Sequence, residues 1–494
     1  MPMGKHASSF FRMIKHNGVP WMWISGISLL MTASCTIGPD FHRPQPSVSP
    51  TWSALGATAP SRASIATPAR AKLVDWWKSF NDPVLTSLVD RAVKSNLDIR
   101  QAEARIRQAR AARGVVASGL WPQADASSSF RRSFSEQTSA SSSGRVGGGV
   151  SDLFQLGLDA TWELDIFGGA RRNIEASEAD IQAAVEDSRD VLVSLVGEVG
   201  TDYISLRGFQ QQIAIARENL DAQRHTADIT QKRYDAGFVS GLDVANAAAQ
   251  VSSTESRIPV LESSARGLIY SLSVLLGQEP AALDLELSKD KPIPLIPPEV
   301  PVGLPSELLR RRPDIRRAEA QLHASTARIG VATADLFPKF SLTGSFGTTG
   351  SEISLLGNWS SRAWSFGPTI SWPVFDAGRI RSNIEVQNAL QEQALVAYQK
   401  TILTALKDVE TALVAYAKEQ EHHKAISEEV AHNRTAVDLS MKLYVAGKTD
   451  FLNVLTAQRS LYLSEDALVQ STRSLSTNLI ALYKALGGGW EEPR

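Results

Sequence analysis

Cysteine is almost absent from this chain: Cys35 is the only one among 494 residues. An internal disulfide is therefore excluded. The chain also has almost no excess of charge of either sign: 51 basic residues balance 52 acidic ones, and the formal net charge is −1. Without a basic excess the chain has no general attraction for nucleic acid. We expect no nucleic-acid partner.

Signatures of catalysis are sparse. The stretch "YVAGKTDF" contains Gly-Lys-Thr, but Lys442 stands where a phosphate-binding loop needs its first glycine. There is no Gly-x-Ser-x-Gly motif. The densest group of candidate metal ligands is "EHH" followed by His432, and two adjacent histidines do not share a helix face. We expect no enzyme, no metal and no cofactor.

The N-terminus has the pattern of a secretory signal. Basic Lys5, Arg12 and Lys15 precede the apolar run "VPWMWISGISLLMTA", which ends in small residues before Cys35. That run is short for a membrane-spanning helix, and no run of about 18 apolar residues follows Cys35. The stretch "LMTASC" resembles a bacterial lipobox, although Thr32 stands where leucine is usual. This predicts a signal peptide over 1–34 and a covalent lipid on Cys35.

The rest of the chain repeats one plan twice. "YDAGFVSGLDV" matches "YVAGKTDFLNV" at a constant offset of 210 residues. "LDIRQAEARIRQARAARGVVASGLWP" matches "PDIRRAEAQLHASTARIGVATADLFP" at an offset of 216. Such self-similarity indicates an internal duplication.

Helical and strand periods alternate within each copy. Apolar and small residues recur every three or four positions from Ile99 and from Ile315, which predicts closely packed, coiled-coil-like helices. The proline-free stretches 171–235 and 379–444 are long enough for helices of about 100 Å. "FQLGLDATWEL", "WSFGPTISWPV", "KFSLTGSF" and "QADASSSFRRSF" instead alternate apolar with polar residues or glycine. Such stretches are typical of transmembrane β-strands, or of half-buried strands in a soluble sheet.

Four strands are too few to close a barrel in a membrane, where an unpaired edge has no water to satisfy it. If these strands span a membrane, the chain must oligomerise. Two chains would supply eight strands, and three would supply twelve with room for water inside. The prolines between residues 292 and 305 exclude helix and favour an extended connector between the copies.

Several long motifs resemble one known family. "TIGPDFHRP", "WWKSFNDPVLTSLV", "GLPSELLRRRPDIRRAEAQL", "RIGVATADLFPKFSLTGSFG" and "WPVFDAGRIRSNI" are similar to the outer-membrane factors of tripartite RND efflux pumps, the NodT and OprM type related to TolC. The resemblance covers nearly the whole chain. It implies a homotrimer with a 12-stranded outer-membrane β-barrel, continuous with a 12-helix periplasmic α-barrel and an equatorial domain. It also implies a periplasmic adaptor (membrane fusion protein), an inner-membrane RND transporter and surrounding outer-membrane lipids as partners.

The expected boundaries combine the duplication with this resemblance. They are a signal peptide at 1–34, an N-terminal strap and equatorial segment at 35–95, helices at 96–121 and 313–337, β-hairpins at 122–169 and 338–376, helix pairs with a periplasmic tip at 170–277 and 377–486, a proline-rich equatorial linker at 278–312, and a tail at 487–494.

The resemblance also places a gate at the two tips. It implies that Leu452 and Thr456 line a constriction with Asn453 nearby, in a tip that begins at Tyr444 and Gly447. In the first copy the matching tip contains Tyr234, Gly237 and Asp243. Relatives often carry aspartates at positions matching Asn453 or Thr456, so an acidic, cation-selecting ring is not expected here. Asp243 matches an acid used in closure contacts, and a capping-box carboxylate three residues after Ser240 is an equally good interpretation.

Three hypotheses follow. The first is a passive outer-membrane duct for drugs or other small molecules, opened iris-like at its periplasmic tip, with antibiotics, solvents, dyes and signalling molecules all open as cargo. The second is a lipid-anchored periplasmic enzyme, for which Glu421, His422, His423 and His432 form the strongest candidate site. The third is a coiled-coil tether, which leaves the amphipathic hairpins unexplained.

Overall fold

The computed structural model describes residues 36–53, 65–67, 73–135, 149–297 and 299–490. The predicted signal peptide and Cys35 lie outside these ranges. The chain divides into two units. Of the described residues, the sheet unit comprises those within 36–40, 115–175 and 327–387, and the helical unit comprises those within 41–114, 176–326 and 388–490.

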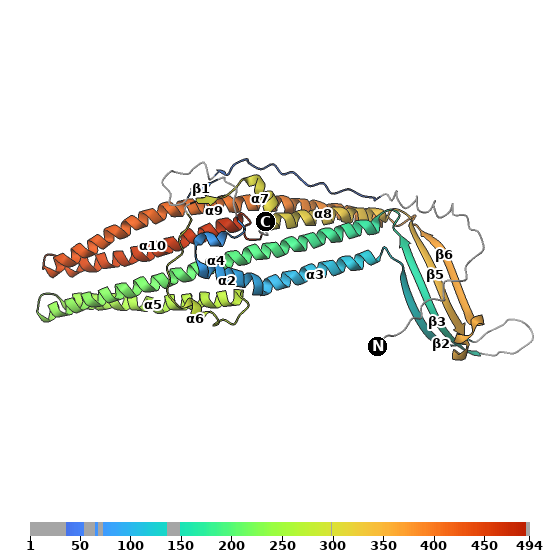
Figure 1. Cartoon of the computed structure of the whole chain (residues 1–494), viewed down its shortest axis with the longest axis horizontal. Helices are drawn as coiled ribbons and strands as arrows, with labels where there is room; N and C mark the ends of the chain where they lie inside the picture. Colours follow the sequence, from blue (N-terminus) through green and yellow to red (C-terminus); the bar gives the residue numbers. More distant parts are fainter. Residues whose placement is uncertain (1–35, 54–64, 68–72, 136–148, 298, 491–494) are drawn as a thin grey trace, which may run out of the picture. The chain divides into compact units, whose positions relative to one another are not determined.

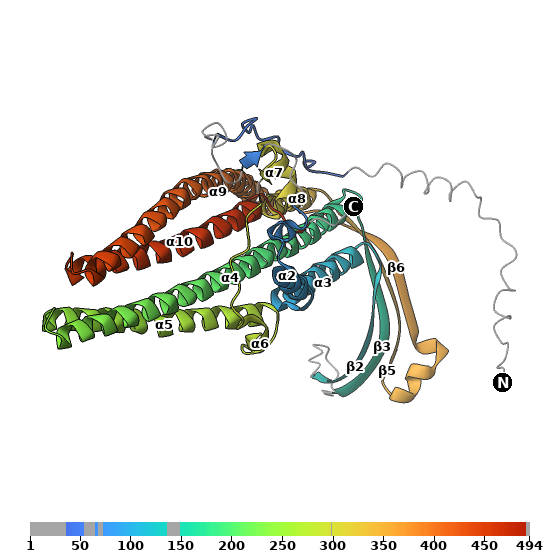
Figure 2. The ribbon, with the colours of Figure 1, turned by 60° about the vertical axis from the view of Figure 1, so that its left-hand side comes forward.

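The duplication is visible in the lengths of the helices. Each copy contributes a 22-residue helix, a 67-residue helix and a 35-residue return helix. In the first copy these are α3 (Leu97–Ser118), α4 (Gly169–Asp235) and α5 (Gly241–Leu275). In the second they are α8 (Pro313–Ala334), α9 (Arg379–Val445) and α10 (Phe451–Ala485). Figures 1 and 2 show α5 running back along α4, and α10 running back along α9.

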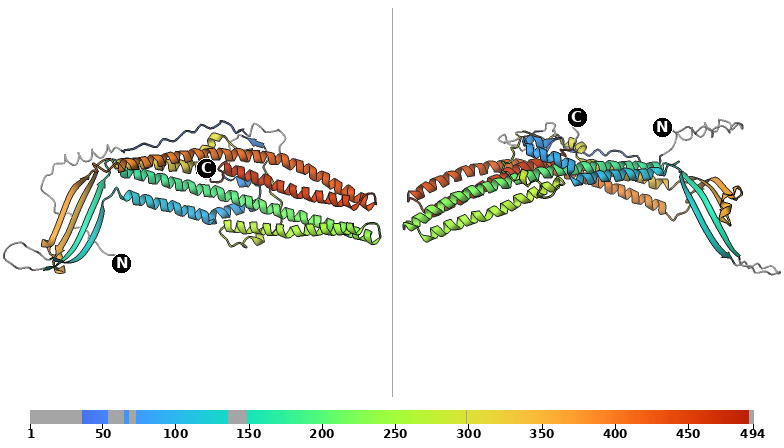
Figure 3. Two further views of the ribbon diagram at one scale, coloured as in Figure 1. Left: turned by 180° about the vertical axis from the view of Figure 1, so that it is seen from behind. Right: turned by 60° about the horizontal axis from the view of Figure 1, so that its bottom comes forward.

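The sheet unit contains one four-stranded antiparallel sheet. Its strands are β2 (Gln123–Ser135), β3 (Gly149–Leu164), β5 (Lys339–Gly350) and β6 (Arg362–Ser371), in the order β2-β3-β5-β6. The central β3–β5 pair joins the two copies. Two short 3₁₀ turns, η3 (Ile353–Gly357) and η4 (Trp359–Ser361), lie between β5 and β6. Figure 3 shows the four strands side by side from two further directions.

The predicted alternation along the strands is confirmed by the register. Phe130 lies opposite Phe154, and Phe346 lies opposite both Leu158 and Trp364, so the large apolar side chains share one face. Much of this apolar face is exposed in the single chain, including Leu158 and Trp364. Small polar groups pair on the opposite face, as where the hydroxyls of Ser345 and Ser365 lie 2.8 Å apart.

A tryptophan ties each hairpin to the helix before it. The indole N–H of Trp162, near the end of β3, donates to the carbonyl of Leu120 at 2.9 Å. Trp372, just after β6, donates to the carbonyl of Leu336 at 3.0 Å. The same bond therefore occurs once in each copy and holds the end of a strand against the C-terminal end of a helix.

The core of the helical unit gathers small elements around the long helices. They are η2 (Trp76–Phe80), α2 (Pro83–Ser95), α6 (Asp284–Leu287), α7 (Pro305–Arg311) and the parallel pair β1 (Ile65–Thr67) and β4 (Glu299–Pro301). Trp76 stacks on Tyr483 with ring centroids 5.2 Å apart. Tyr203, fully buried in α4, donates its hydroxyl to Asp82 at 2.7 Å. These contacts tie α2 and η2 to α4 and α10.

The prediction that the proline-rich connector excludes helix was wrong at its end. Helix α7 begins at Pro305, which occupies one of its first two positions. Proline is tolerated there because the first backbone N–H groups of a helix have no intrahelical partner. Glu299–Pro301 forms the short strand β4, which is the extended structure expected further upstream.

The two short helices differ in burial although their sequences match. In α8 the seam residues Ile315, Leu322 and Ile329 are buried. In α3 only Ala102 is buried, and Leu97 and Val115 are largely exposed. The predicted seam of α3, including Ile99 and Ile106, is half-buried, and Leu97 and Val115 lie outside it on a face that a single chain leaves exposed.

No helix in the part of the chain that the structure describes combines the length and apolarity needed to cross a membrane.

Candidate functional site at the helix tips

The two tips are turns of the same geometry. Gly237 and Gly447 follow the long helices with φ of 77° and 68°, in the left-handed region that favours glycine. The N–H of Phe238 bonds the carbonyl of Arg233, and the N–H of Lys448 bonds that of Leu443. Each bond runs from the N–H of residue i+5 to the carbonyl of residue i, which is the Schellman motif that ends a helix. The Gly-Lys pair of "YVAGKTDF" thus belongs to a helix end.

The caps of the two return helices differ. Ser240 and Asp243 form a complete capping box at the start of α5: the Asp243 carboxylate accepts from the Ser240 N–H at 3.0 Å, while the Ser240 hydroxyl accepts from the Asp243 N–H. Asp450 is the N-cap of α10, but its side chain makes no capping bond. The amide of Asn453 donates instead to the Thr449 hydroxyl at 2.8 Å. The second tip is therefore held less firmly by its cap.

Tyr444 anchors the second tip. It is 1% exposed and packs with Ala247, Phe451 and Val454. The guanidinium of Arg233, on α4, lies 4.6 Å from the centre of the Tyr444 ring and donates to its carbonyl at 2.7 Å. Since Arg233 belongs to the first copy and Tyr444 to the second, this contact joins the two helix pairs of one chain.

The gate candidates lie on the outer side of this cluster. Leu452, Asn453 and Thr456 are exposed, whereas Phe451 and Val454 between them are buried. The exposed fraction of Leu452 is 64%. The Thr456 hydroxyl donates to the carbonyl of Leu452 at 2.8 Å, so it is occupied within α10. The structure thus places these three residues on one face of the first turns of α10.

Tyr234 and Tyr444 match in sequence but not in environment. Tyr234 is 46% exposed, and its ring packs beside Gly241. Asp243 is committed to its capping box with Ser240. The first tip presents Phe238 and Leu242 to the outside, both strongly exposed. Leu242 is the residue that corresponds to Leu452 at the offset of 210.

A polar ladder between the helix pairs was not anticipated from the sequence. Its rungs on α4 recur every seven residues, at 212, 219, 226 and 233. Gln212 donates to Asp466 at 2.6 Å and Asn219 to Glu465 at 3.0 Å. The remaining rungs are the bond from the Gln458 amide to the Thr226 hydroxyl at 2.8 Å and the Arg233–Tyr444 contact.

Glu465 is the branch point of this polar ladder. Its second carboxylate oxygen accepts from Arg434, on α9, at 3.0 and 2.9 Å. Glu465 therefore connects α4, α9 and α10 although only 9% of its surface is exposed. Polar groups buried at a heptad seam fix register because an alternative packing leaves them unpaired. The signal available in the sequence was a seven-residue spacing of polar residues along α4.

The candidate enzyme site is not assembled. His422 contacts Glu419 at 3.1 Å, whereas His423 contacts Thr472 at 3.0 Å on α10. Within the described ranges no three His, Cys, Asp or Glu side chains group closely enough to hold a metal ion. Burial lowers the pKa of His423, and the nearby Glu419 carboxylate opposes this shift.

Comparison with known proteins identifies the family. The model of the family described as "Outer membrane efflux protein" matches residues 88–278 and 304–488. Nodulation protein T of Rhizobium leguminosarum bv. trifolii is 31% identical over 470 residues, which cover 93% of this chain and 96% of that protein. The pyoverdine export outer membrane protein OpmQ of Pseudomonas aeruginosa is 33% identical over 445 residues, covering 89% of this chain and 93% of its own length.

A solved structure agrees with these relatives. The outer-membrane channel OprN superposes with a TM-score of 0.84 at 38% sequence identity, covering 92% of this chain and 100% of that chain. The four-stranded sheet and the long helices are the fold of such a channel. The predicted family, fold class, efflux-channel function and outer-membrane localisation are confirmed. The chain belongs to the outer membrane efflux protein family and is an outer-membrane efflux channel.

Proposed function

We propose that three copies of this chain form a passive duct through the outer membrane, with a gate at the tips of the α9–α10 pairs. The three sheets join into one 12-stranded barrel, and the helices continue it as a periplasmic tunnel. The chain converts no chemical energy and needs no cofactor. A lipid on Cys35 adds a second attachment to the membrane.

The observation that carries this proposal is the open sheet. Among the described residues, β2 and β6 each pair with a single strand, so the backbone groups on their outer sides have no partner within the chain. The apolar face of the same sheet is exposed. A sheet in lipid must close on itself, and other copies of the chain can close it. Twelve strands also leave room for water inside the barrel.

Helix α3 supports the same assembly. Only Ala102 of its 22 residues is fully buried within one chain, and the predicted seam, including Ile99 and Ile106, is half-buried. Leu97 and Val115 on this helix are exposed by 60% and 74%. A neighbouring copy would cover these side chains, as α8 is already covered within its own chain.

Leu452 is the proposed constriction. Its side chain points away from the Tyr444 cluster, because its neighbours Phe451 and Val454 are packed in that cluster. Repeated by threefold symmetry, three leucines at one level narrow a water-filled tunnel with apolar groups. Asn453 and Thr456 on the same face are uncharged, so this constriction carries no acidic ring.

Opening then requires the α9–α10 pair to move relative to the α4–α5 pair. The polar ladder between these pairs, including Arg233–Tyr444, resists that movement. We propose that a periplasmic adaptor docks around the tips and shifts this balance, while an inner-membrane transporter supplies the energy. One relative exports pyoverdine by name. The cargo of the present duct is set by its partner transporter.

Single-channel conductance in a planar bilayer tests the gate. We expect the natural protein to conduct in discrete steps, and Leu452→Ala to open more often or wider. Leu242→Ala is the matched control, because Leu242 is the equivalent exposed leucine of the first tip. Equal conductance of Leu452→Ala and the natural protein would move the constriction elsewhere. No conductance from folded trimers, even with the tip mutated, would remove the duct in favour of a tether.

A further inference from the structure

The first described residues of the chain are held by a buried arginine. Arg172, near the start of α4, donates to the carbonyls of Ile37 and Gly38 at 3.1 and 3.3 Å. It also pairs with Asp40 at 2.6 Å. Only 5% of the Arg172 side chain is exposed. Residues 36–40, called here the strap, are therefore bound through two backbone carbonyls and one carboxylate, all by one guanidinium.

Backbone contacts complete this attachment. The N–H of Ile37 donates to the carbonyl of Phe167 at 3.2 Å, in the turn between β3 and α4. A Cβ on Gly168 would lie 2.9 Å from the Cα of Thr36. The strap thus begins directly against the end of a strand of the four-stranded sheet.

Two glycines let the strap cross α8. Gly38 has φ of 100°, and a Cβ built on it would lie 2.4 Å from the Cα of Gly330. A Cβ built on Gly330 would lie 2.9 Å from the carbonyl oxygen of Ile37 and 2.8 Å from the Arg172 side chain. Real side chains do not tolerate such distances, so the crossing requires glycine on both sides.

The contacts that bind the strap each occur in only one of the two copies. At the offset of 210, Arg171 corresponds to Arg381, but Arg172 corresponds to Ser382. At the offset of 216, Gly330 corresponds to Gly114, where an added Cβ would meet nothing within 4 Å. The strap contacts an arginine of the first copy that the second copy lacks. Repetition of the fold alone therefore does not account for Arg172.

We propose that Arg172 and Gly330 form a docking clamp that positions the N-terminus of the mature chain at the end of β3. The clamp holds the lipid on Cys35 beside the sheet that enters the membrane. This inference rests on the lipidation of Cys35 in the proposed function. Consecutive Cα atoms lie about 3.8 Å apart, so fixing Thr36 limits how far a lipid on the preceding residue can lie from the sheet. Arg172 acts as a positioning residue. It keeps the lipid-bearing N-terminus next to the end of β3, so that the lipid and the sheet enter the membrane at the same depth.

The clamp is tested first by hydrogen exchange of the purified, full-length lipoprotein in detergent. In Arg172→Ala we expect the amide of Ile37 to exchange at least about tenfold faster, which corresponds to loss of one charge-assisted hydrogen bond. Arg172→Lys keeps the charge opposite Asp40 but not the forked donor geometry. The exchange rate of the Ile37 amide in this variant should therefore lie between the rates in the natural protein and in Arg172→Ala. Gly330→Ala should accelerate the same amide, and Gly114→Ala should leave it unchanged. Unchanged exchange in both Arg172→Ala and Gly330→Ala would overturn the clamp.

The positioning role is tested by combining Arg172→Ala with loss of the lipid. The comparison chain carries Cys35→Ser and is secreted behind an ordinary, non-lipoprotein signal peptide. The readout is the fraction of chains in the outer membrane as heat-modifiable trimer. With the lipid, we expect Arg172→Ala to lower this fraction several-fold. Without the lipid, the same substitution should have little further effect, since no anchor remains to be positioned.

The other outcomes are equally decisive. An equal loss in the lipidated and unlipidated chains would show that Arg172 only stabilises the fold, and would overturn the positioning role. Mass spectrometry of the natural protein distinguishes failure of the lipid anchor from failure of the proposed duct. An unmodified Cys35 would refute the lipid anchor and with it the positioning role, while the conductance test of the duct would stand unaffected.

Discussion

Asn96 and Arg312 occupy equivalent positions in the two copies and make the same bond with different chemistry. The Asn96 amide donates to the carbonyl of Leu275 at 2.9 Å, and the Arg312 guanidinium donates to that of Ala485 at 3.0 Å. Leu275 and Ala485 are themselves equivalent, as the last residues of α5 and α10. Each copy therefore ties the start of its short helix to the end of its return helix.

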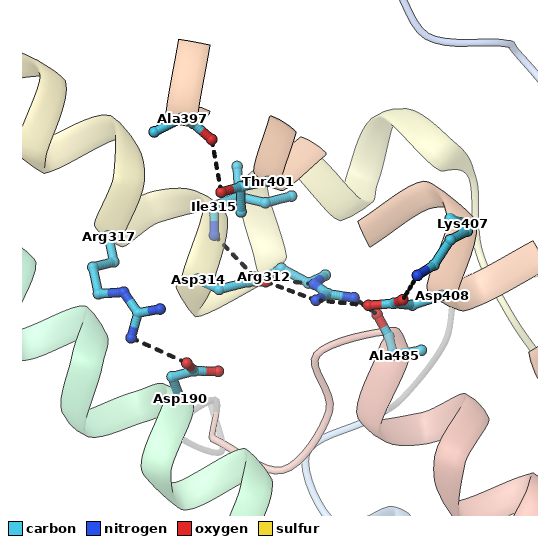
Figure 4. A network of polar contacts seen from close by, with 10 residues as sticks. All are labelled: Asp190, Arg312, Asp314, Ile315, Arg317, Ala397, Thr401, Lys407, Asp408 and Ala485. Atoms are coloured by element: carbon cyan, nitrogen blue, oxygen red, sulfur yellow. Dashed lines mark hydrogen bonds and ion pairs between the residues drawn. The ribbon is translucent and has the colours of Figure 1, made fainter. Parts of the chain in front are cut away.

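The second copy needs two residues for what Asn96 does alone. Asn96 also caps α3, because its side-chain oxygen Oδ1 accepts from the N–H of Asp98 at 2.8 Å. In the second copy Asp314 accepts from the N–H of Ile315 at 2.9 Å, and Arg312 pairs with Asp314 at 2.7 Å. Figure 4 shows Arg312 between Asp314, Asp408 and the Ala485 carbonyl. In the second copy an ion-pair network thus stands where the first copy has a single asparagine.

Arg312→Ala should loosen the start of α8. The substitution leaves Asp314 and Asp408, which are partly exposed, without their shared cation. A hydrogen bond to a charged group contributes about 1.5 to 3 kcal/mol. Hydrogen exchange of residues 313–318 measures the local free energy of opening. Arg310→Ala, at an exposed site on α7, serves as control and should leave this exchange unchanged. Equal protection in Arg312→Ala and the natural protein would contradict a stabilising role for this network.

Gly277→Ala should destabilise the helical unit more than Gly237→Ala does. Both glycines have positive φ, and a left-handed conformation costs a residue with a Cβ about 1 kcal/mol. At Gly277 the new Cβ would also lie 2.6 Å from the carbonyl oxygen of Ser95, whereas at Gly237 it meets nothing within 4 Å. The midpoint of urea unfolding, followed by tryptophan fluorescence, should fall further for Gly277→Ala. Equal midpoints for the two variants would show that the contact with Ser95 relaxes freely.

Arg233→Leu should make the second tip more mobile. The variant loses the bond to the Tyr444 carbonyl and the contact with its ring, and leaves that carbonyl without its cationic donor. A charged hydrogen bond contributes about 1.5 to 3 kcal/mol. We expect the open probability in a planar bilayer to rise, and amide exchange around residues 444–447 to accelerate about tenfold or more.

The control for this prediction is Arg224→Leu. Arg224 lies on the same helix but pairs with Glu255 of α5, at 3.0 Å, within one helix pair. It does not cross to α9 or α10 through that bond. A similar rise in open probability for Arg224→Leu would show that any loss of charge on α4 opens the tip, and would contradict the specific role of Arg233.

The middle of the α9–α10 pair should weaken in acid. Burial lowers the pKa of His423 below its ordinary value of 6.5 in the folded protein. The unfolded segment then binds more protons than the folded one between the two pKa values, so stability is complete above pH 6.5 and falls as the pH drops below it. Exchange near residues 419–425, normalised for intrinsic rates, should rise from pH 7.5 to 5.5 in the natural protein and less in His423→Gln. His432→Gln, at an exposed position, should behave like the natural protein.

Periodicity was sufficient to predict the repeated architecture. The proline-free stretch 171–235 became α4, and the alternation in "FQLGLDATWEL" became β3 with its apolar side chains on one face. These predictions held because a period of 3.6 or 2 recorded over many residues averages out individual exceptions. The long motifs shared with known channels supplied the family, which periodicity alone does not identify.

The contacts between the copies were not predictable in the same way. Arg233 and Tyr444 are 211 residues apart in the chain. A hydrogen bond to a backbone carbonyl requires a particular donor side chain, but any residue can supply the carbonyl. The acceptor residue therefore cannot be recognised from its type. The contact of residues 36–40 with Arg172 was likewise not predicted. The sequence indicated an N-terminal strap within 35–95, but Arg172 is one of several arginines near the start of a long helix. Pro305 misled for a local reason, since proline both ends and begins helices.

The polar ladder on α4 divides the contact between the helix pairs among several separate bonds instead of one. Its rungs stand seven residues apart, so neighbouring rungs are about 10 Å apart along the helix. Because the rungs are separate bonds, loss of the Arg233–Tyr444 contact at the tip leaves the bonds at Thr226, Asn219 and Gln212 in place. If the tip opens as proposed, we expect the two helix pairs to separate stepwise from Arg233. A partner bound at the tip then needs to break only that contact to start the separation.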